Sequence, residues 1–380
     1  MKIVHLADIH LGYRAYSKLS SDGFNIREKD VLRAFNEALE KISKINPDLI
    51  IISGDVFHRP RPTNATIYNT IDLLLKFRKT CDSPIIMIAG NHETIKTTES
   101  GSILKIFGKI IPKIIVIDEH IESVPLGNLD ASVLCVPYSG LSSLEKYNLK
   151  PDKSFKYNIL AIHGTYQNID KLAGYKESTI IKDSDIYEAE WNYIAFGHYH
   201  KFTRLAPNAY YSGAIERTTT NIWQEADDPK GFIEFDFDEK DEKKYTFHSL
   251  ESPRPVTDIK KINAKDLTAE EINQKIIQET SKINNLDKSI VRLTFDNVDS
   301  IALREIDYKK IREFKKTAVY FKVNFIKKDI SVTLNKNENG EIIEKKKNIF
   351  EYLEQELAQF ELSQGIDREK FNRMAHDYLK

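Results

Sequence analysis

The sequence predicts an α/β protein whose strands end in polar, reactive side chains. Short apolar segments alternate with amphipathic, helix-like segments through residues 1–200, which is typical of layered strands and helices. Hydrophobic residues make up 41% of the chain and aromatic residues 10%, enough for a large core, so a disordered chain is excluded. Each apolar segment stops at a glycine, an aspartate or a histidine. These observations place the candidate chemistry at the ends of strands.

The predicted elements follow in order along this region. The first strand is "KIVHLADIH", residues 2–10, and a helix follows near 28–45. The remaining elements are a strand at 49–55, a helix near 64–78, and three strands at 85–93, 158–164 and 193–200. The apolar side chains of the first helix recur at helical spacing and form one stripe, made by Val31, Leu32, Phe35, Ala38, Leu39, Ile42 and Ile45.

A boundary is predicted at "ESPRPVTD", residues 251–258, where two prolines follow the charged stretch "DEKDEKK". Beyond it, a helix near 268–283 and strands at 289–295 and 318–325 indicate a small α/β domain. The polar stretch "NKNENGEIIEKKKN" indicates a flexible linker. We therefore expect domains at 1–250 and 251–332, a linker at 333–348 and a separate segment at 349–380.

The last segment predicts a helical hairpin. Two apolar stripes repeat at spacings of three and four, with "SQG" between them and Asp367 as a helix cap. A hairpin this small buries its apolar faces poorly, so it must dock on the protein body or on a partner, and spacing alone leaves both open. The stripes are Phe350, Leu353, Leu357 and Phe360, followed by Phe371, Met374 and Tyr378.

Composition bounds the setting of the protein. Lys and Arg total 56 against 57 Asp and Glu, and this near-neutral balance neither supports nor excludes nucleic acid as a partner. Two cysteines are too few for a disulfide scaffold and fit a reducing cytoplasm. Polar residues interrupt the first strand, so we expect no signal peptide, and no apolar run approaches the ~20 residues that span a bilayer.

Six of the ten histidines lie at or just beyond the predicted strand ends. Ligands bind at the carboxyl ends of strands in α/β sheets, so these side chains are candidates for one site. Oxygen and imidazole donors without thiolate suit manganese, iron or zinc in an open site. Seven such donors are too many for one ion but suit two ions bridged by a carboxylate, which is common in phosphoester hydrolysis. The seven are Asp8, His10, Asp55, Asn91, His163, His198 and His200.

Two of these pairs, Asp8 with His10 and His198 with His200, have i, i+2 spacing. In an extended segment this spacing puts both side chains on one side. Each motif alone has a structural alternative, since "GD" after a strand is often a turn. All five motifs in order, each at a strand end, favour the metal site.

The ordered set D-x-H, G-D, G-N-H, H and G-H-x-H resembles the calcineurin-like metallophosphoesterases over residues 1–215. That resemblance implies a four-layer αββα sandwich. Protein phosphatases of this fold continue the second block as G-D-x-x-D-R-G, whereas this chain reads "GDVFHRPRP". Together with "LADIHLG" and "YSGAIER", this block is similar to the SbcD family, the nuclease subunits of DNA double-strand-break repair complexes.

The resemblance implies roles for individual residues. Asp55 would bridge two ions, expected to be Mn²⁺. His92 would stabilise the transition state and protonate the leaving 3′ oxygen, and His58 would orient the scissile nucleotide. Glu93 departs from the G-N-H-D of many nucleases, and we expect it to orient a neighbour by hydrogen bonding. The first ion would be held by Asp8, His10 and His200, and the second by Asn91, His163 and His198.

The family also implies activities and partners. We expect a 3′→5′ exonuclease and endonuclease acting on double-stranded DNA ends and hairpins, a DNA-capping domain at 251–332, and a homodimer. The segment 349–380 would dock on a coiled-coil ABC-type ATPase. Tyr13 is expected to stack on a base, or else to pack on the protein body. The charged run "LREIDYKKIREFKK" could meet phosphates or form a solvated helix face.

Two alternatives remain at the level of sequence. One is a phosphatase or small-molecule phosphodiesterase of the same fold, favoured by Glu93 and the neutral charge. The other is a scaffold without catalysis, which would be free to lose ligands that this chain retains.

Overall fold

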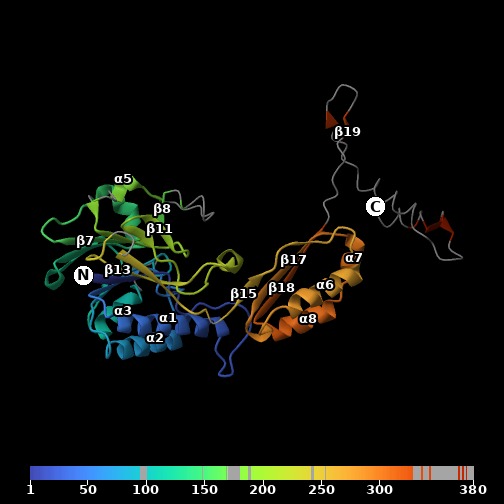
Figure 1. The fold of residues 1–380 in the computed structure, drawn as a ribbon, viewed down its shortest axis with the longest axis horizontal. Coiled ribbons are helices and arrows are strands. Elements are labelled where there is room, and N and C mark those ends of the chain that lie inside the picture. The colour runs from blue at the N-terminus through green and yellow to red at the C-terminus, as the bar shows by residue number, and fades with distance from the viewer. Residues whose placement is uncertain are drawn as a thin grey trace.

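Two six-stranded sheets and a smaller unit with a four-stranded sheet make up most of the computed structural model (Figure 1). The α/β class predicted from the sequence is confirmed. The structure describes residues 1–94, 101–147, 149–167, 169, 180–186, 190–240, 244–252, 254–327, 335, 336, 342, 343, 367, 368, 370, 371 and 374.

The first sheet has the order β14-β13-β1-β2-β3-β4. Its strands β1 to β4 are parallel, and β13 and β14 extend the sheet in antiparallel fashion beside β1. The carboxyl ends of β1 to β4 therefore point to one edge of the sheet, which is where ligands bind in such sheets. The strands are β1 (Lys2–Leu6), β2 (Leu49–Ser53), β3 (Ile85–Ile88), β4 (Ile114–Ile117), β13 (Gly231–Asp236) and β14 (Tyr245–Ser249).

The second sheet has the order β11-β12-β10-β7-β6-β5. Strands β6, β7, β10 and β12 are parallel, and β5 and β11 close the edges in antiparallel fashion. The strands are β5 (Glu122–Leu126), β6 (Ala131–Val136), β7 (Tyr157–His163), β10 (Tyr193–Gly197), β11 (Thr203–Ala206) and β12 (Ala209–Tyr211). Short strands β8 (Thr165–Tyr166) and β9 (Ile180–Ile181) pair beside this sheet.

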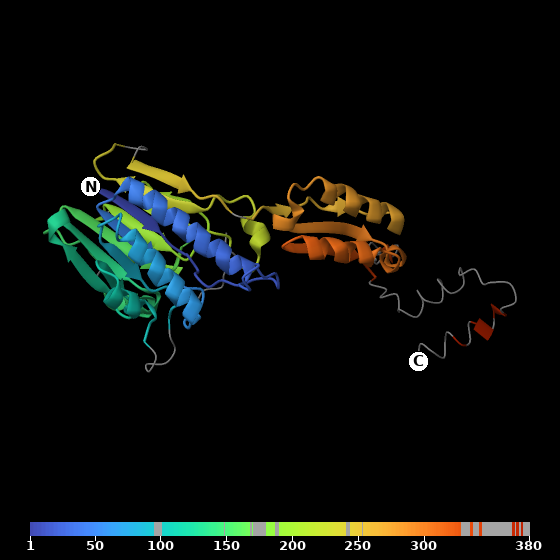
Figure 2. The same ribbon diagram turned by 90° about the horizontal axis from the view of Figure 1, so that it is seen from below.

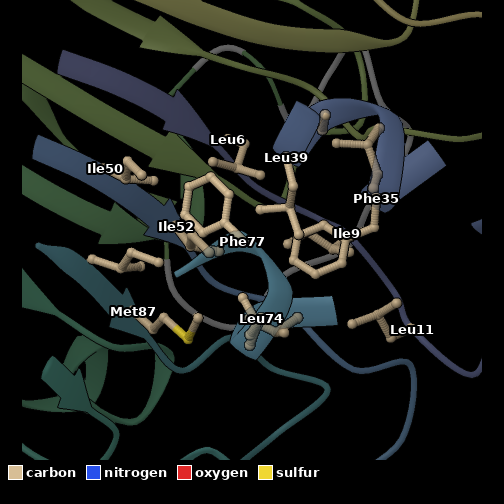
Figure 3. Close-up of a cluster of buried hydrophobic side chains, with 14 of the residues drawn as sticks. Leu6, Ile9, Leu11, Phe35, Leu39, Ile50, Ile52, Leu74, Phe77 and Met87 are labelled. Carbon is tan, nitrogen blue, oxygen red and sulfur yellow. The ribbon is translucent and has the colours of Figure 1, made fainter. Parts of the chain in front are cut away.

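The sheets pack face to face, and helices cover the outer face of the first. Alternate residues of each strand face opposite sides, so Ile51 packs toward the second sheet while Ile50 and Ile52 pack against the helices. Figure 3 shows Ile52 and Met87 beside side chains of α1 and α2. The helices are α1 (Ile26–Ile45), α2 (Asn64–Phe77) and α3 (Leu104–Ile110), with α1 and α2 side by side in Figure 2.

Shorter helical turns connect the strands of the two sheets. They are α5 (Asp183–Ile186), η1 (Gly127–Leu129), η2 (Tyr138–Lys146) and η4 (Ile222–Glu225). The buried stripe of α1 is the one its apolar spacing predicts, with Phe35, Ala38 and Ile42 fully inside.

The second unit begins after residue 255 and has its own core. Strands β15 (Val256–Asp258) and β16 (Ile262–Asn263) pair with one edge of β17 (Ile290–Val298), and β18 (Tyr320–Lys327) pairs with the other, all in parallel. One face of this sheet packs on helices, where Leu293 and Phe295 join Ile272 and Ile311 in a buried cluster. The helical segments are α6 (Ala269–Ser281), η6 (Leu286–Lys288), α7 (Ser300–Arg304) and α8 (Tyr308–Thr317).

The two units are held together by an aromatic contact and a capping lysine. The rings of Tyr16 and Tyr320 stack with centroids 4.2 Å apart. Lys18 Nζ donates to the carbonyls of residues 316, 317 and 318, which end α8, at 2.6–3.2 Å. A cation at a helix carboxyl end interacts favourably with its unpaired carbonyls.

The predicted C-terminal hairpin lies mainly outside the described residues, including Phe350, Leu353, Leu357, Phe360 and Tyr378. Asp367 accepts the N–H of Lys370 at 2.9 Å, as a helix cap does. Met374 is 66% exposed. Within the predicted linker, β19 (Asn335–Lys336) pairs with β20 (Ile342–Ile343). Across the described part of the chain, every helix is too short or too polar to span a bilayer.

Candidate two-metal centre

The ends of five strands meet where the two sheets join, and their side chains form two groups that contain a carboxylate and a third group made of histidines alone. One ligand atom from each member of a group lies within 4.8 Å of the others. The first group comes from the ends of β1 and β10, and the second from the ends of β2, β7 and β10. The groups with a carboxylate are Asp8, His10 and His200, and Asp55, His163 and His198, and the third group is His10, His58 and His92.

Asp55 lies between the groups. Its Oδ2 is 3.8 Å from Nε2 of His10 and 3.6 Å from Nε2 of His163. Asn91 joins the second group, because its Oδ1 is 3.1 Å from His163 Nε2 and 2.9 Å from His198 Nδ1. All seven donors predicted from the sequence are therefore brought together, and Asp55 occupies the place of a shared ligand.

The backbone at this junction is strained. Asp8, His10 and Asp55 have φ of 52°, 55° and 53°, and His198 has φ of 102°. Such values are uncommon for residues with a Cβ and are held only where the surrounding fold determines them, which is frequent at functional sites. Strands β1, β2 and β10 consequently end at Leu6, Ser53 and Gly197, before the residues that the sequence pattern included in them. Strand β3 also ends early, at Ile88.

The strain also corrects one expectation. The i, i+2 spacing predicted an extended segment from His198 to His200, but His198 has φ of 102°. The two side chains lie in different groups, in line with the separate ions that the resemblance implied for them. The left-handed turn at His198 redirects the chain between them. Asp8 and His10 do share a group, although both have left-handed backbone instead of extended backbone.

Glycines in the motifs allow the two sheets to approach each other. A Cβ on Gly197 would lie 1.8 Å from the Ser53 carbonyl oxygen, and one on Gly54 would lie 2.1 Å from His163 Nδ1. A Cβ on Gly90 would lie 2.1 Å from Asp55 Oδ1. The glycines of the G-D, G-N-H and G-H-x-H motifs are therefore required by close packing around the carboxylate.

Backbone carbonyls orient two of the imidazoles. His163 Nδ1 lies 2.7 Å from the Ser53 carbonyl, and His92 Nδ1 lies 2.7 Å from the His58 carbonyl. Since a carbonyl only accepts, both Nδ1 atoms donate, and each Nε2 is left with a lone pair in the neutral ring. His163 Nε2 faces Asn91 and Asp55, as a metal-ligating nitrogen requires.

His92 and His58 lie beside the first group. The His92 ring is 4.7 Å from that of His10, and its Nε2 is 4.0 Å from Asp55 Oδ2. The side chain of His92 remains about one-third exposed, so it can reach a bound substrate. The His58 ring lies 5.0 Å from the His92 ring. His58 therefore contributes to the site twice, through its ring and through the carbonyl that holds His92.

The charges of the centre fit divalent cations. Asp8 and Asp55 are 0% and 2% exposed, and in the described chain their ion-pair partners are histidine rings. Burial works against charge on either partner, but their attraction lowers the pKa of the Asp55 carboxyl and raises the pKa of His163 to about 9. Buried carboxylates are normally paired or bound to metal. Two carboxylates, together with imidazoles that bind metal in their neutral form, are therefore a suitable donor set for two ions.

Comparison with known proteins agrees with this geometry. The family model of calcineurin-like phosphoesterases matches residues 1–202. The chain belongs to the calcineurin-like phosphoesterase family. The resemblance inferred from the ordered motifs is thereby confirmed, and the matched residues include every donor of the two groups.

Curated relatives of this phosphoesterase share one name, DNA double-strand break repair protein Mre11. The protein of Methanococcus maripaludis is 31% identical over 208 residues, covering 53% of this chain and 52% of the relative. That of Archaeoglobus fulgidus is 32% identical over 242 residues, covering 57% and 50%. That of Methanocaldococcus jannaschii is 26% identical over 323 residues, covering 83% and 78%. The chain thus spans about half the length of the first two relatives.

Glu93 of this phosphoesterase binds backbone N–H groups beside the donor groups. It is buried, and its carboxylate accepts the N–H groups of Asp55 at 3.1 Å, Phe57 at 2.5 Å and Gly90 at 2.9 Å. Burial and the nearby Asp55 raise the pKa of the Glu93 carboxyl to about 8, against the opposing effect of the donors. Glu93 joins the loops after β2 and β3 and so orients Asp55.

Two residues near the site carry no motif in the sequence. Glu225 Oε1 lies 3.2 Å from His200 Nδ1, and Lys230 Nζ lies 3.1 Å from Glu225 Oε2. Burial alone would raise the pKa of Glu225, but His200 and Lys230 outweigh it and lower the pKa to about 2. A fully buried Lys paired with a Glu is rare in proteins, so in a structure the pair indicates a residue with a specific role. In the sequence, nothing in the spacing of these residues identifies them.

Tyr13 is 7% exposed and its ring packs edge-on against His58 at 5.0 Å. The Arg27 guanidinium lies 6.0 Å from the ring on another side. This placement favours the alternative of a loop tyrosine packed on the protein body. A stacking contact with a nucleic-acid base stays a prediction, and it would require the ring to leave this position.

The close packing at Gly54 generates a testable prediction. Gly54→Ala should lower Tm, because the added methyl meets the His163 ring and an L-residue is strained at φ of 90°. Overpacking of this kind costs about 1–3 kcal/mol. The stabilisation by Mn²⁺ should shrink as well, since His163 is displaced. Thermal unfolding with and without Mn²⁺ measures both effects.

The matched control for this change is Gly127→Ala. Gly127 has no atom within 4 Å of an added Cβ and no left-handed backbone. Its variant should unfold and respond to Mn²⁺ like the wild type. Equal melting of the two variants would contradict the packing role of Gly54.

Proposed function

We propose that this phosphoesterase is a two-metal-dependent DNA nuclease that processes double-strand breaks. The observation that carries the proposal is the pair of donor groups sharing Asp55, with the partly exposed His92 beside them. The names of the curated relatives supply the substrate class, DNA at double-strand breaks. We expect 3′→5′ exonuclease and endonuclease activity, with Mn²⁺ as the ion.

The residues of the chain divide the work. The first ion would be held by Asp8, His10 and His200. The second ion would be held by Asn91, His163 and His198, and Asp55 would bind both ions. Bound ions supply Lewis acidity toward the phosphodiester and activate water. His92, held by its Nδ1 donor bond, presents Nε2 to stabilise charge on the phosphoryl oxygens and to protonate the leaving oxygen. His58 would position the nucleotide next to it.

Positive charge next to this centre supports a nucleic-acid substrate. Arg59 and Arg61 follow His58 and are exposed, with Arg14 beside them around a small hollow of about 60 Å³. In the second unit, α8 exposes Lys309, Arg312, Lys315 and Lys316. Arginine and lysine provide most of the affinity for a phosphate backbone. We propose that residues 251–332 cap bound DNA.

Partners are also proposed. Exposed apolar side chains lie on α2 and α3, where Tyr68 is 71%, Leu75 41% and Ile110 50% exposed. We propose that the chain forms a homodimer, and these exposed apolar side chains are candidates for its interface. Residues 349–380 would bind a coiled-coil ABC-type ATPase, and within this segment Met374 is 66% exposed.

The direct test of the function uses two substrates. Purified protein with Mn²⁺ should shorten linear duplex DNA and leave a chromogenic phosphomonoester intact. EDTA should abolish the activity. Cleavage of the ester without cleavage of DNA would instead favour a phosphatase, and inactivity on both with metal bound would favour a scaffold.

The separate roles of His92 and Asp55 predict different metal contents. His92→Ala should keep two bound ions while losing about 10²–10⁴-fold in cleavage rate, as expected for loss of a general acid. Asp55→Ala should lose metal, because it removes the shared ligand. Elemental analysis of the purified variants checks this. His120→Ala, a change at an exposed histidine, is the control, and a metal-free His92→Ala would show that the role assigned to His92 is wrong.

The docking role predicts the effect of removing residues 349–380. The truncated chain should keep its Tm and its Mn²⁺-dependent cleavage, and affinity for the coiled-coil ATPase should fall sharply, because helix-in-groove contacts depend on a few apolar anchors. Packing on the body would instead bury several large side chains, each contributing roughly 1.5–3 kcal/mol. A large fall in Tm with partner affinity intact would therefore refute partner docking.

A further inference from the structure

The one-turn helix η4 lies between the metal centre and the second unit. Its backbone is fixed by Arg217, whose guanidinium donates to the carbonyls of Glu225 at 2.8 Å, Ala226 at 2.9 Å and Asp228 at 3.2 Å. Three bonds from one rigid guanidinium leave the turn little freedom. Arg217, the last residue of "YSGAIER", thus anchors η4 to the strand end beyond β12.

One side of η4 supports the second unit. Ile222 is buried with Ile290 and Val319 of that unit, and β15 packs against the turn. The Trp223 ring lies 4.7 Å below the Arg292 guanidinium and 6.3 Å from the Tyr320 ring. Tyr320 also stacks on Tyr16. The second unit therefore supports η4 in addition to Arg217.

The last residue of η4 reaches the metal centre. Glu225 is 5% exposed, with Oε1 3.2 Å from His200 Nδ1 and Oε2 3.1 Å from Lys230 Nζ. Lys230 is 3% exposed and also donates to the His200 carbonyl at 2.9 Å. The lysine, the carboxylate and the histidine form a buried cluster of ion pairs, and within the described chain Glu225 is the one acid in ion-pair contact with His200 Nδ1.

The chemistry of His200 depends on this contact. Its Nε2 faces the donor group, 3.0 Å from His10 Nε2 and 3.9 Å from Asp8 Oδ1. Nε2 can ligate an ion only when the ring proton is on Nδ1, and a carboxylate at Nδ1 holds that tautomer and the ring orientation. Loss of such a support typically weakens metal binding 10–100-fold.

We propose that Glu225 is a positioning residue for His200, and that seating of the second unit on η4 holds Glu225 in place and so sets affinity for the first ion. The inference rests on the proposed two-metal centre. The inference predicts that a change at the contact between the units lowers the affinity for the first ion and leaves the affinity for the second ion unchanged. The second ion, whose imidazole His163 is held by the Ser53 carbonyl, is independent of η4.

The test is a Mn²⁺ titration of the full-length chain after EDTA treatment, followed by calorimetry. Glu225→Gln should weaken one of two Mn²⁺ sites about 10–100-fold and leave the other unchanged. Tyr320→Ala should weaken the same site. At this site the double variant should bind Mn²⁺ no more weakly than Glu225→Gln alone. Both changes act through the same contact of Glu225 with His200, so their effects are not additive. Nitrogen NMR of the His200 ring should show loss of the Nδ1-protonated form in Glu225→Gln, which general destabilisation would not produce.

Two control variants are available in the chain. Glu234→Gln removes a carboxylate that also joins a lysine and a histidine, at 2.8 Å from Lys2 Nζ and 2.7 Å from His248 Nε2, away from the site. Tyr320→Phe keeps the aromatic ring. Both should bind Mn²⁺ like the wild type. If Glu225→Gln fails to fold because Lys230 is left unpaired, the variant with both Glu225→Gln and Lys230→Met removes both buried charges and should show the same selective loss.

Equal weakening of both sites, unchanged binding in Glu225→Gln, or full additivity with Tyr320→Ala would each overturn the inference. Failure of the proposed function looks different. A wild-type chain that takes up fewer than two Mn²⁺ ions would refute the two-metal centre itself, and the inference with it, before any variant is compared.

Discussion

The contact between the end of β2 and the ends of β7 and β10 is the constraint on which the centre depends. Here the Ser53 carbonyl accepts from His163, the Ser53 hydroxyl donates to the Ala195 carbonyl at 3.0 Å, and the backbone of Gly197 lies against Ser53. The contact brings the carboxyl ends of two separate parallel sheets to one point. A single sheet would present donors along a line, whereas two facing sheets surround a volume, which two ions require.

The energy that holds this contact comes from the cores on either side of the first sheet. Left-handed backbone at Asp8, His10, Asp55 and His198 costs about 1–3 kcal/mol for each residue. Strands β1, β2 and β3 are buried on both faces, so their ends cannot relax toward regular geometry without disturbing packed side chains. Strain at the ligands is thus a consequence of a rigid scaffold, and it presents the donors before any ion arrives.

Much of the fold and site could be predicted from the sequence, because strands and donors both leave local patterns. The apolar runs predicted β1, β2, β3, β7 and β10, and the polar residues that end them predicted the seven donors. Strands β4, β5, β6 and β11 to β14 were not predicted. In β11, β13 and β14 polar and apolar side chains alternate or mix, and β4 and β12 are only four and three residues long. Glu225 and Lys230 were not found either, because their role arises from a loop that returns to His200 and from no spacing along the chain.

Glu93 shows how a motif difference can be judged by what a side chain contacts. In the sequence, an acid longer than the aspartate of many nucleases favoured a phosphatase. In the structure, both of its oxygens are occupied by three backbone N–H groups, and none faces the volume between the donors. Its length is set by the span between the loops after β2 and β3. Because the carboxylate of Glu93 is bonded to the backbone, its presence gives no support to a phosphatase. The proposal of a DNA substrate draws its support from His58, His92 and the arginines beside them.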